Sequence, residues 1–146
     1  MWTTICERPD MGAIALADTS FVVALLNSED SQHQWAVEQA GKYVTPWRTC
    51  EAVLSEADHL LGSHGWSSLA ALLRREAIVM AFRLEDEQHR VLALMARYAN
   101  LPMAFADACL VRMTERVSYS VVLTADSHFR LYRRYDRQII PCALPD

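Results

Sequence analysis

The feature that most constrains the fold is a repeated alternation of short apolar runs with longer stretches of helical periodicity. The short runs predict strands at residues 13–17, 43–45, 77–82, 119–124 and 138–141. These runs are apolar almost throughout rather than alternating with polar residues, as is typical of parallel strands covered by helices on both faces. We therefore expect an α/β fold, a three-layer α/β/α sandwich around a mostly parallel sheet of about five strands.

Helices are predicted between the strands from polar capping residues at their starts and from glycine or proline at their ends. The first is apolar on nearly all sides, so we expect it to be buried. The second starts at Asp30 and stops at Gly41, and Pro102 ends the fifth. The predicted helices span residues 21–27, 30–41, 48–61, 66–76, 85–99, 105–117 and 127–134.

A length of 146 residues fits one domain, and a 52% apolar, 22% charged composition excludes a disordered chain. We expect this domain over residues 13–146, with an N-terminal extension over residues 1–12. The sequence has no apolar run of membrane-spanning length and no apparent secretory signal, so we expect a cytoplasmic protein with no membrane association. The four cysteines are too widely spaced for a zinc site, and we expect them to be reduced: Cys6, Cys50, Cys109 and Cys142.

Two aspartates follow strand-like runs, at the positions where ligands bind in open parallel sheets. Asp18 ends the first predicted strand, and Asp126 follows the strand at 119–124. An aspartate at such a junction is also a common helix N-cap, so its position alone leaves both roles open. The occurrence of one after each of two apolar strands favours a site at this edge of the sheet.

A third aspartate lies on the apolar face of a predicted helix. On the helix at 105–117, Asp107 shares its face with Leu110, Val111 and Thr114. A carboxylate in that position must be paired, hydrogen-bonded or bound to a cation, because its desolvation is costly. The structural alternative is a buried carboxylate that the N–H groups of the helix N-terminus satisfy.

On the helix at 48–61, Glu56 and Asp58 flank opposite edges of the apolar stripe, and periodicity does not choose between them. Other chemistries lack essential parts, since the sequence contains no glycine-rich phosphate loop and no G-x-S-x-G motif. An aspartyl-phosphate site would need a second aspartate beside Asp18 and a distal lysine. Position 20 is Ser20 instead, and the single lysine, Lys42, precedes the second predicted strand.

Four short segments follow one another in a characteristic order between about Ala13 and the C-terminus. They are Ala17-Asp18-Thr19-Ser20-Phe21, Val53-Leu54-Ser55-Glu56-Ala57, the run from Pro102 to Val111, and Leu123-Thr124-Ala125-Asp126 followed by Phe129. Together they resemble the PIN domain family, and within it the VapC-type toxins of bacterial toxin–antitoxin pairs. The order and spacing of the segments, more than any single motif, carry the resemblance.

The resemblance implies a flavodoxin-like sandwich, single-stranded RNA as substrate, Mg²⁺ or Mn²⁺ as cofactor, and a homodimer held by an antitoxin. It places the metal ligands and catalytic acids at Asp18, Glu56, Asp107 and Asp126, and so favours Glu56 over Asp58. Ser20 and Thr124 match polar residues that line the same pocket. The ion would activate a water for attack on a phosphodiester, and Asp126 or Glu56 would orient that water or take its proton.

The basic residues are concentrated near the C-terminus, in the part of the chain that contains Asp107 and Asp126. The formal net charge of −4 argues against non-specific coating of nucleic acid. Six arginines nevertheless gather in the last quarter of the chain: Arg112, Arg116, Arg130, Arg133, Arg134 and Arg137. We expect Arg112, Arg130 and Arg133 to contact substrate phosphates, because the planar guanidinium suits that geometry. A solvated basic face is the structural alternative.

The leading hypothesis is therefore a metal-dependent endoribonuclease that serves as the toxin of a type II toxin–antitoxin pair. Relatives often carry acids at the positions of Ala104 and His128. This departure motivates an alternative, a non-catalytic PIN-like module that binds an antitoxin or RNA. A third hypothesis is a PIN nuclease that processes RNA without a toxin role.

Overall fold

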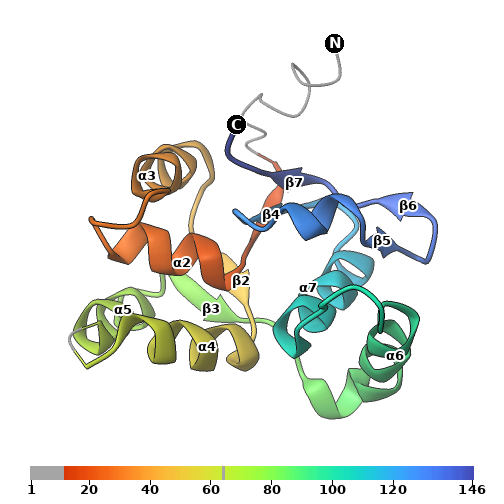
Figure 1. Ribbon diagram of the computed structural model, residues 1–146. Coiled ribbons are helices and arrows are strands. Elements are labelled where there is room, and N and C mark those ends of the chain that lie inside the picture. The colour runs from red at the N-terminus through yellow and green to blue at the C-terminus, as the bar shows by residue number, and fades with distance from the viewer. Residues whose placement is uncertain (1–11, 64) are drawn as a thin grey trace.

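The computed structural model describes residues 12–63 and 65–146, so most of the expected N-terminal extension, including Cys6, lies outside the described residues. A five-stranded parallel sheet with the order β3-β2-β1-β4-β7 forms its centre (Figure 1). Its strands are β1 (Ile14–Ala17), β2 (Trp47–Thr49), β3 (Ile78–Met80), β4 (Ser120–Leu123) and β7 (Cys142–Ala143). The expected α/β sandwich around a parallel sheet is confirmed.

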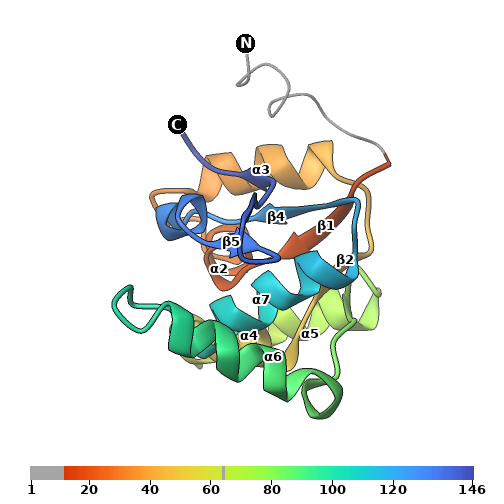
Figure 2. The ribbon, with the colours of Figure 1, turned by 90° about the vertical axis from the view of Figure 1, so that its right-hand side faces the viewer.

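Six α-helices surround the sheet. They are α2 (Thr19–Leu26), α3 (His33–Lys42), α4 (Glu51–Leu61), α5 (Trp66–Arg74), α6 (Leu84–Arg97) and α7 (Phe105–Arg116). In Figure 2, α3 lies above strands β4 and β1, while α4, α5, α6 and α7 lie below them. Within the described residues, no helix is long and apolar enough to cross a membrane.

The core explains why the apolar runs form these elements. Strand β1 is buried from Ala15 to Ala17, and β4 is buried along its whole length, as expected of central parallel strands. The first helix is buried through Phe21, whose ring packs edge-on against Trp47 at a centroid distance of 5.2 Å. Cys50 and Cys109 are buried and free of disulfides, which agrees with the expected reduced state.

The second strand does not lie at residues 43–45. Tyr43 caps the end of α3, and Val44 is 58% exposed, so this pair of β-prone residues lies outside the sheet. The strand is Trp47–Thr49, where Trp47 and Thr49 are buried and pair with β3. As a consequence, α4 begins at Glu51 rather than at residue 48.

The C-terminal elements also differ from the expectation. A 3₁₀ helix, η1, covers only Ser127–Arg130, where an α-helix to residue 134 was predicted. The chain then forms a small antiparallel hairpin of β5 (Arg133–Arg134) and β6 (Gln138–Ile139). The fifth parallel strand is β7, so the strand predicted at 138–141 exists only as β6, in the antiparallel hairpin and not in the central sheet. The buried Arg134 helps to fix the hairpin in place, since its side chain donates a hydrogen bond to the Thr114 carbonyl of α7 at 2.6 Å.

Candidate metal centre

The sheet brings two of the predicted acids to the same edge. Strands β1 and β4 are parallel neighbours, with Ala17 opposite Leu123. The next residue after β1 is Asp18, whose backbone N–H donates to the Leu123 carbonyl at 3.1 Å. Asp126 follows β4 by three positions and begins η1 as its N-cap. Both strands therefore end at one place, as the pattern of apolar runs predicts.

Hydroxyl groups hold the buried Asp18 carboxylate. Thr124 donates to its Oδ2 at 2.6 Å, and Ser20 donates to the same oxygen at 3.1 Å. The backbone continues this network, because Asp126 N–H donates to Thr124 Oγ1 at 2.9 Å and Ala125 N–H donates to Ser20 Oγ at 2.8 Å. Ser20 and Thr124, which were expected to line the pocket, thus contact Asp18 directly.

Asp107 approaches from α7, whose N-terminus is near the same edge. Its side chain is buried at 7% exposure, as its place on the apolar helix face indicates. Oδ2 accepts hydrogen bonds from the Ala104 backbone N–H at 3.1 Å and from the Tyr132 hydroxyl at 3.2 Å. One of these donors is the helix N-terminus that the structural alternative invoked, and the other is a side chain from a distant part of the sequence.

The electrostatics show that the acids act on one another. Burial raises the pKa of Asp18 to about 7, and the charge of Asp107 adds to this rise against the hydrogen bonds from Thr124 and Ser20. Burial also raises the pKa of Asp107, with contributions from the charges of Asp126 and Glu56. The charge of Asp107 thus acts on Asp18, and the charges of Asp126 and Glu56 act on Asp107.

Glu56 lies on the exposed face of α4 and borders this cluster. It lines a depression of about 590 Å³ together with Ser55, His59 and the exposed ring of Phe105. The charge of Glu56 contributes to the raised pKa of Asp107. Asp58 is exposed on the same helix.

The ligand chemistry fits a hard divalent cation. All four candidate groups are carboxylates, the ligands that Mg²⁺ and Mn²⁺ prefer. The donors to Asp18 and Asp107 converge on Oδ2 in each case, and both donors from His128 converge on Oδ1 of Asp126. Among the described residues, no side chain donates a hydrogen bond to the second oxygen of any of these three aspartates.

The side chains stand farther apart than a formed coordination sphere requires. In the described part of the chain, no three His, Cys, Asp or Glu residues lie close enough together to hold a metal ion as placed. The charges of neighbouring carboxylates contribute to the raised pKa of Asp18 and of Asp107. A cation would offset both the repulsion and the burial cost.

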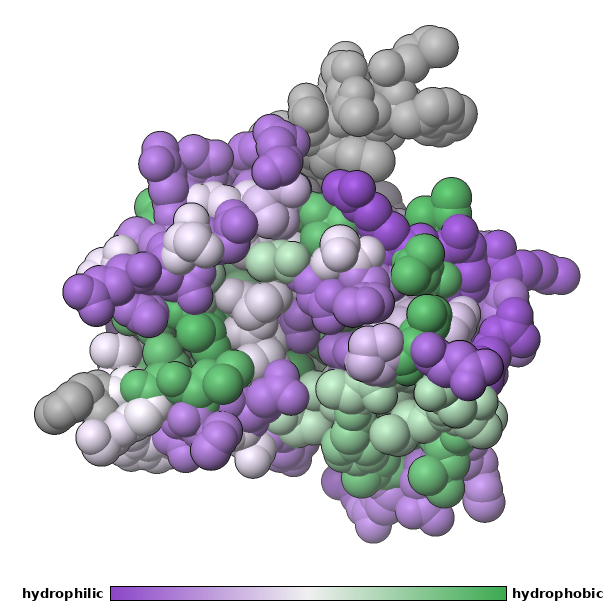
Figure 3. Space-filling model, viewed as in Figure 1, coloured by the Kyte–Doolittle hydropathy of each residue, from purple (hydrophilic) through white to green (hydrophobic). Residues whose placement is uncertain are grey.

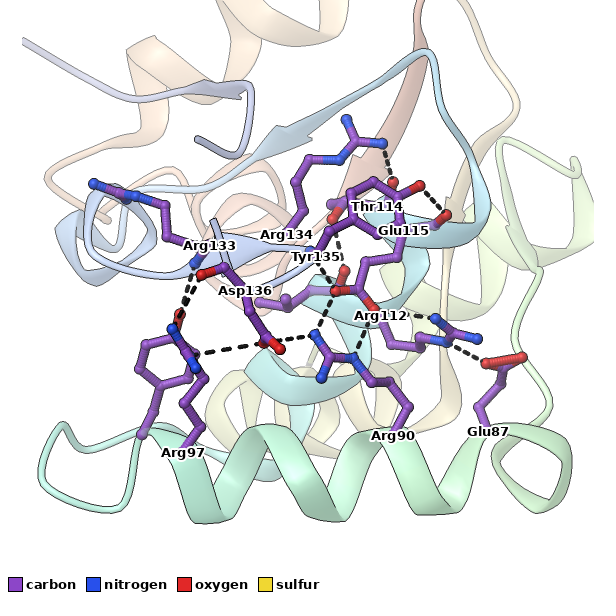
Figure 4. Close-up of polar contacts among 12 residues, drawn as sticks. Glu87, Arg90, Arg97, Arg112, Thr114, Glu115, Arg133, Arg134, Tyr135 and Asp136 are labelled. Carbon is purple, nitrogen blue, oxygen red and sulfur yellow. Dashed lines mark hydrogen bonds and ion pairs between the residues drawn. The ribbon is translucent and has the colours of Figure 1, made fainter. Parts of the chain in front are cut away.

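The three predicted RNA-contacting arginines lie in different surroundings. Arg130 is exposed at the end of η1, and Arg133 is half-buried at the start of β5. Arg112 instead forms ion pairs with Glu87 and Glu115 (Figure 4). The structure therefore keeps Arg130 and Arg133 near the chain segment that follows Asp126, and engages Arg112 between α6 and α7.

Sequence reasoning missed two side chains of the cluster. Tyr132 reaches Asp107, and the His128 ring contacts Asp126 Oδ1 through Nδ1 at 2.8 Å. In the sequence, His128 stands out only as a position at which relatives often carry an acid. Its position two residues after an N-capping aspartate is a local signal for this contact, because such an aspartate accepts from the backbone N–H of that residue as well. Tyr132 offers no comparable local signal.

The comparisons with known proteins identify the family of this chain and a structure with the same fold. The model of the PIN domain family matches residues 15–135, and the chain belongs to that family. Its structure is similar to that of Mycobacterium tuberculosis VapC20, a toxin that cleaves the sarcin-ricin loop, with a TM-score of 0.67 and 20% sequence identity. The alignment covers 74% of this chain and 86% of that one, and it shows a shared fold. A search of the curated proteins finds no match.

Proposed function

We propose that this protein is a metal-dependent endoribonuclease that uses Mg²⁺ or Mn²⁺ and serves as the toxin of a type II toxin–antitoxin pair. The observation that carries the proposal is the coupled cluster of Asp18, Asp107 and Asp126 at the carboxyl edge of a PIN-family sheet, with Glu56 beside it. The structural similarity to a ribonuclease toxin supports the same activity.

In this proposal the four acids hold the cation. A divalent cation held by these residues would supply the Lewis acidity that activates a water and stabilises the departing oxygen of the phosphodiester. Asp18 is held by Thr124 and Ser20 at a fixed position, so its carboxylate needs little reorganisation to bind the cation. The exposed Glu56 or the partly exposed Asp126 orients the attacking water or takes its proton.

Arginines next to the cluster supply the contacts to RNA phosphates. Arg130 is exposed, and Arg133 N–H donates to the Tyr98 hydroxyl at 2.9 Å, which anchors the backbone of β5. Guanidinium groups make paired hydrogen bonds to phosphate oxygens. An acidic segment of an antitoxin could bind the same groups and thereby block access of RNA.

A homodimer and an antitoxin complex both require exposed apolar surface. The protein exposes several large apolar side chains, among them Trp66, Leu92 and Ile139. On the face shown in Figure 3, apolar residues form separate patches among polar ones. Exposed apolar patches of this kind are typical of surfaces that bind other proteins.

Cleavage of RNA by the purified protein tests the proposal. Wild-type protein with Mg²⁺ or Mn²⁺ is expected to cut RNA, and Asp18→Ala and Asp107→Asn are expected to abolish cutting. Asp58→Asn provides a matched control for Glu56→Gln, because both side chains are exposed on α4. Equal cleavage by wild type and by the aspartate variants would rule out the proposed site. Growth arrest that co-expression of a neighbouring antitoxin relieves would support the toxin role.

One observation favours the non-catalytic alternative. His128 donates its backbone N–H to Asp126 Oδ1 at 2.9 Å, and its ring contacts the same oxygen. If these contacts withdraw Asp126 from the cluster, the chain would bind an antitoxin or RNA without cutting it. Calorimetry distinguishes the two functions, since the enzyme binds Mn²⁺ in isolation and the module does not.

A further inference from the structure

Tyr132 contacts one of the candidate acids, Asp107, although it comes from the loop between η1 and β5. Its side chain is fully buried. The ring packs edge-on against Tyr98 and against Phe129, each at a centroid distance of 5.2 Å. Two aromatic neighbours of this kind fix the plane of the ring, so the core determines where the hydroxyl points.

The Tyr132 hydroxyl donates to Asp107 Oδ2 at 3.2 Å. A phenol hydroxyl beside a carboxylate oxygen acts as the hydrogen-bond donor. The Ala104 N–H donates to the same oxygen of Asp107, and the two donors together restrain that carboxylate.

We propose that Tyr132 is a positioning residue for the metal centre, which holds Oδ2 of Asp107 and leaves Oδ1 to bind a divalent cation. The inference rests on the proposed function, because it assigns Tyr132 a role in the same site. A group that holds a metal-binding carboxylate in place contributes strongly to metal affinity, and its loss typically weakens binding by roughly 10-fold or more.

The competing explanation is that Tyr132 is a core residue whose hydroxyl uses the nearest acceptor. Tyr98 provides the comparison, since its ring belongs to the same aromatic group and its hydroxyl accepts a hydrogen bond from the Arg133 backbone N–H at 2.9 Å. Tyr98→Phe therefore removes one hydrogen bond from the same region without altering the contacts of an acid.

The experiment measures the affinity of the full-length protein for Mn²⁺ by isothermal titration calorimetry, without RNA. Tyr132→Phe is expected to weaken Mn²⁺ binding roughly 10-fold. Tyr98→Phe is expected to leave Mn²⁺ affinity unchanged, although it should lower the melting temperature of the metal-free protein about as much as Tyr132→Phe does. Equal Mn²⁺ affinity of wild type and Tyr132→Phe, or equal weakening by both substitutions, overturns the proposal.

A double substitution tests whether Tyr132 acts through Asp107. In the Asp107→Asn background, Tyr132→Phe is expected to cause no further change in the rise in melting temperature that Mn²⁺ produces. The same additional loss in both backgrounds would show that the hydroxyl acts by another route, and the proposal would fail. Failure of wild-type protein to bind Mn²⁺ would contradict the proposed function as a whole, which distinguishes that result from a failure of the positioning role.

Discussion

The Thr124 hydroxyl donates to Asp18 Oδ2 across 2.6 Å, although the two residues are 106 positions apart in the sequence. The Thr124 oxygen also accepts the Asp126 N–H at 2.9 Å. One side chain thereby joins the ends of two neighbouring strands and links two candidate metal ligands. The geometry of the cluster depends on this hydroxyl as much as on the carboxylates.

Replacing Thr124 is expected to shift the pH dependence of cleavage. The Thr124 hydrogen bond lowers the pKa of Asp18 against the larger effect of burial, so its removal raises that pKa further. In Thr124→Val, a higher pH is then needed to ionise Asp18, and the acid limb of the pH–rate profile moves up by about one unit. Thr124→Ser keeps the hydroxyl and serves as the control. An unshifted acid limb in Thr124→Val would contradict the prediction.

Asp18→Asn is expected to stabilise the metal-free protein at alkaline pH. Because the pKa of Asp18 is about 7 in the folded state and near 3.8 when unfolded, folding favours the protonated form. Stability is therefore lost as the pH rises through the interval between these two values. The substitution removes this loss, which is on the order of 4 kcal/mol.

Urea unfolding in the presence of a chelator, at pH 5 and at pH 8, measures this effect. The gain of Asp18→Asn over wild type should be larger at pH 8. Added Mn²⁺ should raise the stability of the wild type at pH 8 and have little effect on the variant. A variant that is less stable than wild type at pH 8 would show that the buried charge is not destabilising.

The ion pairs between α6 and α7 give a prediction for acid stability. Glu115 has a side chain only 1% exposed and accepts from Arg90 at 2.9 and 2.7 Å (Figure 4). Burial acts to raise its pKa, but hydrogen bonds from Arg90, Tyr135 and Arg112 outweigh burial and lower it. The stabilisation of the folded state by ionised Glu115 is therefore present above the unfolded-state pKa of Glu115. It is lost as the pH falls through the folded-state pKa.

Glu115→Gln should therefore reduce the free energy of unfolding at pH 7 by about 3 kcal/mol, because it removes the buried charge that pairs with the partly buried guanidinium groups of Arg90 and Arg112. Asp136→Asn is the matched control, because Asp136 also pairs with Arg90 but is 46% exposed. The control should cost less than about 1 kcal/mol. Chemical denaturation of both variants tests this, and equal costs would contradict it.

The exposed arginines give a prediction for RNA binding. Arg130 and Arg137 are exposed, at the end of η1 and beside β6. Each substitution to glutamine should weaken RNA affinity and reduce the slope of log affinity against log salt by about one. Arg75, exposed at the end of α5 on the other side of the molecule in Figure 1, is the control. A variant that carries both substitutions, Arg130→Gln and Arg137→Gln, gives the decisive result. If its salt slope equals that of the wild type, neither arginine belongs to the RNA-binding surface.

The sequence predicts those parts of the fold that have long, uniform patterns. The apolar runs at β1 and β4 and the helix from Phe105 lie where periodicity indicates, and they place Asp18, Asp107 and Asp126. Strand β2 was missed because it is three residues long and contains Arg48. Strand β7 was missed because the apolar run before it attracted the prediction. In the structure Ile139 of that run belongs to β6 of the hairpin, where it pairs with Arg133 and is 72% exposed.

The site was predictable only in part for a related reason. Acids at strand ends have a sequence signal, because the apolar strand before them is visible. The choice of Glu56 over Asp58 required the family resemblance, since both flank the same stripe. Tyr132 could not be found, because its contact with Asp107 depends on how η1 and β5 pack against α7. Contacts between distant segments leave no local pattern.

The donors that converge on one oxygen of each aspartate have a consequence for ion discrimination. A carboxylate whose second oxygen is held by the protein can offer a cation a single oxygen. Mg²⁺ accepts such monodentate ligands in an octahedral shell completed by water, whereas Ca²⁺ takes more oxygens and often chelates a carboxylate through both. For an ion at the proposed site, chelation of Asp18 by Ca²⁺ would have to break the hydrogen bonds from Thr124 and Ser20. If Asp18 binds a metal ion as proposed, the hydroxyl groups of Thr124 and Ser20 would favour small octahedral cations over larger ones.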